Sequence, residues 1–405
     1  MDNILLFYLL VELGLLVLLC NKYRTPNALV LSYFIFLLYA QSNYLDFLIS
    51  GNYNVKSTSY TSLNFSINSS NYLLASSYYF FFLSIFGTVG LFSNFGIILN
   101  NFSKARVHDL NAKGKMIIVL CCIYIIYYHA MTFGLDRVSK KTFDLFKYDF
   151  IIFYYLFYCW GFELIYAKKK NILFYFMTIV ILLHTIFSFE REFIVLTGLF
   201  LLLKYKKYFK RFKILIISFV ALFVINVWKQ FYIKVIIFSM PLKVFFKELS
   251  FNQTFSSGET TTGMSLLTNF FENNIYKDYY FSYLRNTINQ FVRVFLDTNY
   301  LSLGEFSSEY YTNSKMGTAF SMILESILNF GFLAPLILPL LILNILKHLL
   351  KRNIYYKDFF SVYFVFLMLK LVRTEFTVIL KLYVLPFVLF VLLINYLKKN
   401  QYTSR

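Results

Sequence analysis

The chain has 405 residues, of which 59% are hydrophobic and only 15% are charged. Soluble globular domains carry about a quarter charged residues, so this composition excludes an ordinary soluble protein. In a membrane protein, the formal net charge of +19 indicates basic cytoplasmic loops rather than a surface for nucleic acid.

Apolar runs long enough to cross a bilayer recur along the whole chain. They predict an all-α fold, a polytopic transmembrane helical bundle of about eleven spans. The chain is thereby divided into an N-terminal transmembrane bundle (1–237), one large hydrophilic loop (238–318) and a C-terminal transmembrane bundle (319–405). The spans are predicted at 3–20, 27–48, 73–99, 116–135, 150–167, 172–189, 193–204, 214–237, 319–346, 359–374 and 377–397.

The loops between the predicted spans form a basic set and a nearly neutral set, which alternate along the chain. The runs 168–170 and 204–213 are rich in lysine, whereas 51–72 and 373–376 are nearly neutral. By the positive-inside rule, the basic loops are cytoplasmic. The N-terminus and the large loop are therefore predicted outside the cytoplasm, and the C-terminal tail inside it.

The large extracytoplasmic loop is expected to contain short amphipathic helices. Residues 279–296 place apolar side chains at helical spacing, and Arg285, Asn289 and Arg293 follow one another at four-residue steps. Such a helix is expected on or near the membrane surface. Residues 250–268 are rich in Ser, Thr and Gly and predict a mobile segment.

Cations at the predicted outer ends of spans run against the positive-inside rule and are candidate functional residues. Arg191 lies between the sixth and seventh predicted spans, and Lys370 and Arg373 lie close together near the end of the tenth. Guanidinium groups bind phosphate oxygens in a bidentate manner and stay charged. Arg191 and Arg373 therefore indicate an anion site, the alternative being ion pairs with carboxylates such as Glu192.

Glu325 is an isolated carboxylate about two helical turns from the outer end of the ninth predicted span. At such a depth a carboxylate either pairs with a buried cation or acts as a general base. The other ionisable residues within spans have no partner identifiable from the sequence and are interpreted as packing or pairing residues. They include Glu12, Glu163, His129 and His184.

The sequence gives no reason to expect a cofactor or a metal ion. The four cysteines lie within or beside apolar runs and lack the spacing of metal ligands. The first predicted outer loop, 51–72, contains no carboxylate that would hold a divalent cation. A phosphate-binding P-loop is absent from the sequence as well.

Three segments, in their order along the chain, resemble bacterial O-antigen polymerases of the Wzy type. FSFEREFIVLTGLFLLLKYKKYFKRF (187–212) resembles the family's arginine-led short hydrophobic run before a basic cytoplasmic loop. GTAFSMILESILNFG (317–331) resembles its glutamate-centred segment after the large loop. LKLVRTEFTVILKLYVLPF (369–387) resembles its arginine-bearing turn between the last two spans.

This resemblance implies a metal-independent glycosyltransferase of the bacterial inner membrane whose active site faces the periplasm. Undecaprenyl-pyrophosphate-linked oligosaccharide would be the substrate on both sides of the reaction, and the growing glycan would move onto the next lipid-linked repeat. The bilayer, a chain-length regulator and a flippase of the same pathway are the expected partners, without nucleic acid. The implied site comprises Arg191 and Arg373 at the pyrophosphate, Arg285 and Arg293 as a second clamp from the loop, Lys370 and Asn289 as further substrate-binding residues, and Glu325 as general base.

Three other functions are alternatives to this one. An O-antigen ligase would use the same donor with a lipid A-core acceptor; related ligases carry a histidine where Phe320 and Met322 stand here, which favours a polymerase. A lipid-linked oligosaccharide flippase is a transporter, and transporters of that kind usually have short loops and repeat-related halves. A non-catalytic scaffold does not account for cations at the outer ends of spans.

Overall fold

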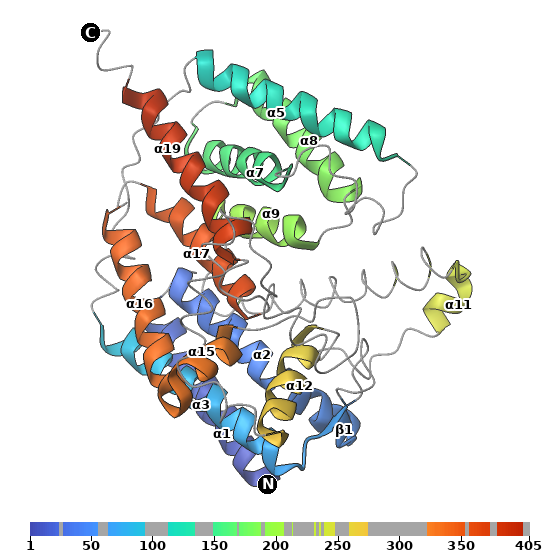
Figure 1. Cartoon of the computed structure of the whole chain (residues 1–405), viewed down its shortest axis with the longest axis vertical. Helices are drawn as coiled ribbons and strands as arrows, with labels where there is room; N and C mark the ends of the chain where they lie inside the picture. The colour runs from blue at the N-terminus through green and yellow to red at the C-terminus, as the bar shows by residue number, and fades with distance from the viewer. Residues whose placement is uncertain are drawn as a thin grey trace. The chain divides into compact units, whose positions relative to one another are not determined.

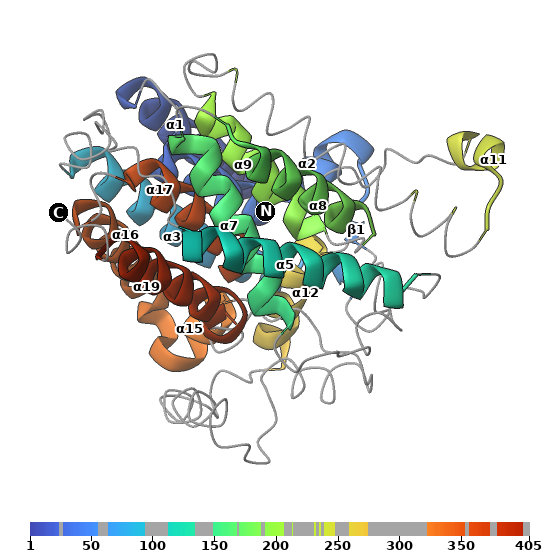
Figure 2. The ribbon, with the colours of Figure 1, turned by 90° about the horizontal axis from the view of Figure 1, so that it is seen from above.

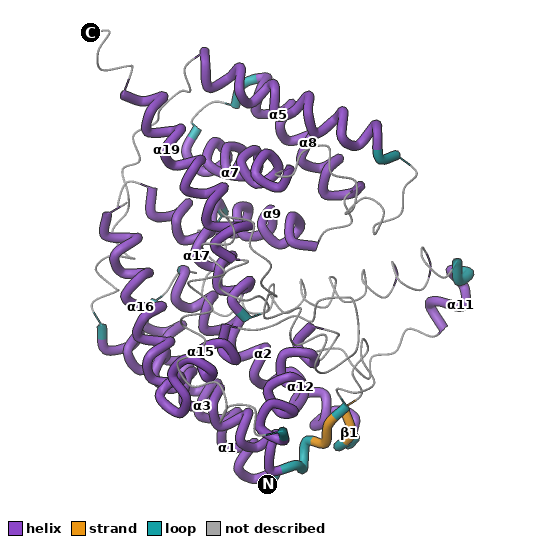
Figure 3. The backbone as a smooth tube through the Cα atoms, in the orientation of Figure 1, coloured by secondary structure: helices purple, strands orange, loops and turns teal. Residues whose placement is uncertain are grey.

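A computed structural model of the chain describes residues 1–23, 27–55, 64–93, 112–133, 149–167, 170–187, 191–205, 213, 231, 235, 239–247, 259–273, 322–352, 356–372 and 379–399. Figure 3 shows that nearly all of this is helix. The two short strands β1 (Asn54–Val55) and β2 (Phe65–Ser66) pair antiparallel. The expectation of a mainly helical protein is confirmed.

Helices occupy every predicted span except 214–237, which lies outside the described residues apart from 231 and 235. The tenth and eleventh spans correspond to α17 (Lys357–Leu371) and to the π-helix η6 (Leu380–Val384) followed by α19 (Leu385–Lys399). The others are α1 (Asp2–Lys22), α2 (Ala28–Ser50), α3 (Ser70–Phe92), α5 (Ala112–Met131), α7 (Asp149–Tyr166), α8 (Ile172–Phe187), α9 (Arg191–Lys204), α15 (Met322–Phe330) and α16 (Ala334–Arg352).

Within the described residues, five helical stretches are long and apolar enough to cross a membrane. They are α1, α2, α3, α5 and the stretch from 323 to 351 that includes α16. The chain thus has helices of the length and composition that a membrane protein requires. The number of spans, their orientation and the large extracytoplasmic loop remain predictions.

Side-chain caps fix where two of these helices begin. The Oδ1 atom of Asn27 accepts a hydrogen bond from the backbone N–H of Val30, 3.0 Å away, at the start of α2. The hydroxyl of Ser69 accepts one from Tyr72 N, 3.1 Å away, at the start of α3. Each cap satisfies a backbone donor that the helix itself leaves unpaired.

The ninth predicted span is interrupted at Gly331. Helix α15 ends at Phe330, a single 3-10 turn covers Gly331–Leu333, and α16 follows. Gly331 has a φ of +55°, in the left-handed region that glycine adopts without a steric penalty. The apolar run is continuous in sequence, so hydropathy alone does not reveal this break.

The described residues form two compact units, and each is built from segments distant in sequence. Unit 1 comprises Met1–Asn100, Lys207–Lys351 and Met368–Thr377. In this unit α1, α2 and α3 lie side by side (Figure 1) and share an aromatic core. The rings of Phe36 and Phe82 meet edge to face at 4.7 Å between centroids, and those of Tyr8 and Phe80 stack at 4.2 Å.

Helix α12 (Glu259–Glu272), from the predicted large loop, packs against α2 and α3 in unit 1. Its buried residues Met264, Leu267 and Phe271 repeat at helical spacing, and the Phe271 ring lies 5.2 Å from that of Tyr78. The prediction of a mobile segment at 250–268 is therefore wrong for its second half. The Ser- and Thr-rich composition concealed an apolar stripe long enough to hold a helix in place.

Unit 2 comprises Asn101–Lys206, Arg352–Leu367 and Val378–Arg405. Its central helix is α7, which packs against α5, α8, α9 and α19 (Figures 1 and 2). Most of the α7 side chains are buried. A helix that is apolar and enclosed on nearly all sides is typical of the interior of a bundle.

A glycine allows the close approach of α9 to α7. A Cβ atom added at Gly161 of α7 would lie 2.3 Å from the Phe200 ring of α9. The same ring stacks on Phe359 at 5.7 Å and meets Trp160 edge to face at 6.1 Å. Because these neighbours enclose Phe200, the ring has little room to move away.

Candidate functional site

The ends of the helices in unit 2 form two groups, one around the beginning of α7 and one around its end. Tyr154, near the start of α7, bonds Glu192 in the first turn of α9, and Ile165, near the end of α7, bonds Lys204 at the end of α9. Helices α7 and α9 therefore run parallel. The ends of α5 and α8 meet the beginning of α7, because Phe153 contacts both Tyr128 and His184.

The group around the end of α7 is basic. Lys170 donates hydrogen bonds to the carbonyls of Glu163 and Leu164, and Lys204 donates to that of Ile165 at 3.1 Å. Cations at a helix C-terminus are stabilised by its exposed carbonyls and its dipole. Partial burial, together with the neighbouring charge of Lys204, lowers the pKa of Lys170 to about 8.

The group around the beginning of α7 is built on the carboxylate of Glu192. Tyr154 donates a hydrogen bond to Glu192 Oε2 at 2.6 Å, and Tyr383 of η6 donates to the same oxygen at 3.2 Å. A carboxylate in the first turn of a helix is also favoured by the helix dipole. Glu192 thus joins three elements, and Arg191 immediately precedes it.

A pair of histidines lies in the same group. His129 Nε2 and His184 Nδ1 are 2.9 Å apart, so one imidazole donates a hydrogen bond to the other. His184 is buried, and its ring packs on Phe153 and Phe193 at 4.4 and 4.6 Å. The sequence predicts packing or pairing roles for both histidines, and in the structure they pair with each other.

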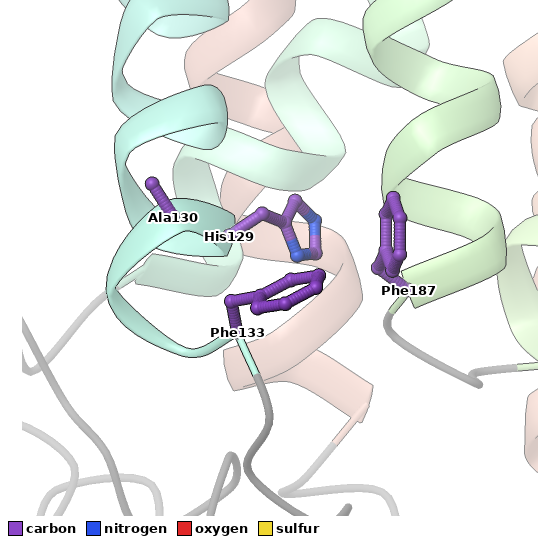
Figure 4. A pocket seen from close by; sticks show the side chains of 4 residues that line it. All are labelled: His129, Ala130, Phe133 and Phe187. Atoms are coloured by element: carbon purple, nitrogen blue, oxygen red, sulfur yellow. The ribbon is translucent and has the colours of Figure 1, made fainter.

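A cavity opens beside this histidine pair. It has a volume of about 320 Å³ and is lined by His129, Ala130, Phe133 and Phe187. Figure 4 shows the Phe133 ring below the His129 imidazole and the Phe187 ring beside it. Its size is at the lower end of the range for small-molecule sites, and mainly apolar walls with one polar group are typical of such sites.

Arg191 lies at the end of unit 2 that contains the beginning of α7 and Glu192. It is the first residue of α9, four residues after Phe187 of the cavity. Consecutive Cα atoms are about 3.8 Å apart, so no more than about 15 Å separates the two backbones. Arg191, the cation predicted to bind the pyrophosphate, therefore lies in the same region of unit 2 as the cavity.

Glu325 and Lys370 belong to unit 1. Glu325 lies in the first turn of α15 and Lys370 in the last turn of α17, and both side chains are buried. Each takes part in at least one polar interaction. A buried carboxylate is compatible with both the pairing role and the general-base role predicted for Glu325. A single site containing Arg191 and Glu325 remains a prediction.

The other predicted site residues lie outside the described residues. They are Arg373 in the predicted turn before the last span, and Arg285, Asn289 and Arg293 of the predicted loop helix at 279–296. Their proposed roles continue to rest on the sequence.

Sequence reasoning missed the partners of two interior polar residues. Glu12 of α1 accepts a hydrogen bond from Gln41 of α2, with Nε2 and Oε2 2.8 Å apart. The sequence did contain an indication of this hydrogen bond, because a carboxylate and an amide occur within adjacent predicted spans. Their register across the helix pair, however, depends on packing that no spacing rule supplies.

Comparison with known proteins identifies no relative: no protein-family model, curated protein or solved structure matches the chain.

Proposed function

We propose that this protein is a glycosyltransferase that polymerises undecaprenyl-pyrophosphate-linked oligosaccharide repeats, an O-antigen polymerase of the Wzy type. The resemblance of the segments 187–212, 317–331 and 369–387 supports this proposal. The observation that carries it is the position of Arg191 as the first residue of α9, at the end of unit 2 that contains the beginning of α7.

The start of α9 suits an anion. The first backbone N–H groups of a helix have no partner within it, and the helix dipole adds partial positive charge there. Arg191 adds a permanent charge at this point, and the tyrosines bonded to Glu192 fix the first turn. A pyrophosphate group would find cationic and N–H partners in one place.

In the proposed reaction, a hydroxyl of the incoming lipid-linked repeat attacks the anomeric carbon of the growing chain. A C–O bond forms, the bond from that carbon to the pyrophosphate breaks, and the electron pair leaves with the pyrophosphate. Arg191 and Arg373 stabilise this developing charge, which lowers the barrier more than it tightens ground-state binding. Glu325 accepts the hydroxyl proton.

Arg285, Asn289 and Arg293 of the predicted loop helix, with Lys370, complete the proposed binding of pyrophosphate and glycan. The substrate sits in the bilayer through its undecaprenyl chain, so a membrane-embedded enzyme is required. The lysines at the other end of unit 2, Lys170 and Lys204, support an orientation in which Arg191 faces the periplasm of a bacterial inner membrane.

Deleting the gene and separating the surface glycolipids on a gel tests the proposal against its rivals. Loss of a polymerase leaves lipid A-core capped with a single repeat. Loss of a ligase leaves bare core with polymer retained on the lipid carrier, and loss of a flippase retains single repeats inside the cell. Bare core in the deletion strain would contradict the proposed function.

A further inference from the structure

A second buried polar site lies in unit 1, within the bundle of α1, α2 and α3. Glu12 stands halfway along α1, and its side chain is 0% exposed. Gln41 Nε2 donates to Glu12 Oε2 at 2.8 Å, and the Tyr33 hydroxyl donates to the Glu12 backbone carbonyl at 3.0 Å. Among the described residues, Glu12 Oε1 has no hydrogen-bond partner.

Within the part of the chain that the structure describes, the helices packed around Glu12 offer no cation to balance a carboxylate. The sequences of α2, α3 and α12 contain neither Lys nor Arg, and α1 contains only Lys22. Lys22 is ten residues from Glu12, about 15 Å along the helix, and it binds the carbonyls of Leu91 and Ser93.

The titratable groups that face Glu12 would not favour its charge either. Tyr33 of α2 and Tyr72 of α3 lie close enough to interact electrostatically with its carboxyl group. Neither phenol carries positive charge. The further acids on these elements are Asp2 on α1, Asp46 on α2, and Glu259 and Glu272 on α12.

An ionised carboxylate without a counter-charge is too costly to bury in a helix bundle and takes up a proton instead. A neutral carboxylic acid needs only its hydrogen bonds, and the Gln41 amide supplies one to its carbonyl oxygen. We infer that Glu12 is a proton-binding site, holding its carboxyl group as the neutral acid at neutral pH within the α1–α2–α3 bundle.

Release of this proton would leave an anion whose one described side-chain partner is an amide. Deprotonation therefore requires water or a cation to reach Glu12, which the packed bundle excludes. Proton release and separation of α1 from α2 are coupled, because each makes the other less costly. This site is independent of the transferase activity proposed above.

Infrared difference spectroscopy of the purified full-length protein at neutral pH tests the inference. The wild type minus Glu12→Gln spectrum is expected to show the carbonyl stretch of a protonated carboxylic acid. Glu272→Gln is the matched control, since Glu272 is an exposed glutamate of α12 in the same unit. Absence of the acid band in the Glu12 difference spectrum would overturn the proton site.

Thermal unfolding gives a second readout that does not depend on spectroscopy. Glutamates of an unfolded chain are ionised at neutral pH, so the folded protein binds one proton more than the unfolded one. The stability contributed by Glu12 should then fall as pH rises from acid towards neutral values, and Glu12→Gln should be at least as stable at neutral pH and lack this contribution. A Glu12→Gln protein that unfolds more readily, or fails to fold, would show that a charged carboxylate is needed and overturn the inference.

Discussion

Glu192 and Tyr383 are 191 positions apart in sequence, yet the tyrosine hydroxyl donates a hydrogen bond to Glu192 Oε2 at 3.2 Å. The bond joins η6 to the first turn of α9, and Tyr154 of α7 donates to the same oxygen at 2.6 Å. All three residues are in unit 2. This arrangement fixes the first turn of α9, which begins at Arg191.

Replacing either tyrosine by phenylalanine should loosen this end of unit 2. Hydrogen bonds to charged groups contribute about 1.5–3 kcal/mol, so Tyr154→Phe and Tyr383→Phe are each expected to lower the free energy of unfolding by about that amount. Thermal unfolding followed by intrinsic fluorescence measures the change. The exposed Tyr175 provides the matched control, and an effect of Tyr175→Phe equal to theirs would contradict the assignment.

Arg191→Ala and Arg373→Ala should abolish long glycan chains while the amount of protein in the membrane is unchanged. Loss of one group that stabilises developing charge slows a reaction by about 10²–10³-fold. Arg191→Lys should recover part of the activity, since a lysine keeps the charge without the planar fork. Full-length ladders from either alanine variant on a glycolipid gel would remove that arginine from the site.

The matched control for the arginine variants is Lys115→Ala. Lys115 is an exposed cation near the start of α5, and the predicted topology places it at the cytoplasmic side. Its loss should leave the ladder unchanged. A shortened ladder from this variant would indicate a general effect of charge on the membrane protein rather than binding of pyrophosphate.

Glu325→Gln should remove activity as completely as loss of an arginine, because the amide cannot accept the hydroxyl proton. General bases contribute about 10²–10⁴-fold to rate. Turnover by purified protein measures this effect, and Glu325→Asp should keep part of it. Near-normal turnover by the glutamine variant would return Glu325 to a purely structural role.

Gly161→Ala should destabilise unit 2. The new Cβ atom would meet the Phe200 ring at 2.3 Å, and overpacking of this kind costs about 1–3 kcal/mol. Gly198→Ala on α9 is the matched control, since a Cβ there meets nothing within 4 Å. Thermal unfolding should separate the two variants, and equal stabilities would contradict the packing described for Phe200.

The stability of unit 2 should depend on pH through Lys170. Its pKa of about 8 in the folded protein lies below the usual 10.5, so the unfolded chain binds more protons between these values. Stability contributed by this group should therefore rise with pH from about 8 to about 10.5. Lys170→Met should flatten that rise in thermal unfolding scans, and an unchanged slope would contradict the burial of Lys170.

Much of the helical architecture could be predicted from sequence, because apolar runs of membrane length have few other structures available to them. The starts of α1 and α2 were predicted to within one residue, whereas α3, which Ser69 caps, begins three residues before its predicted span. The break at Gly331 was not predicted, since hydropathy does not respond to one glycine. Helix α12 was missed because its apolar stripe lies among Ser and Thr residues.

The candidate site was less predictable, because its contacts join residues distant in sequence. Arg191 is recognisable in the sequence because its charge lies at an unexpected place. The tyrosines that bond to Glu192 cannot be distinguished from the many other tyrosines of the sequence. The partners His129 and His184 come from different helices, 55 positions apart. Such pairings depend on helix rotation and register, which a single sequence does not specify.

Reconstitution of the purified protein with undecaprenyl-pyrophosphate-linked repeats tests the central claim most directly. The account predicts that the wild type lengthens the lipid-linked glycan in the presence of a metal chelator and releases undecaprenyl pyrophosphate. Arg191→Ala should do neither. Failure of the folded wild-type protein to lengthen the glycan, or transfer only to added lipid A-core, would contradict it.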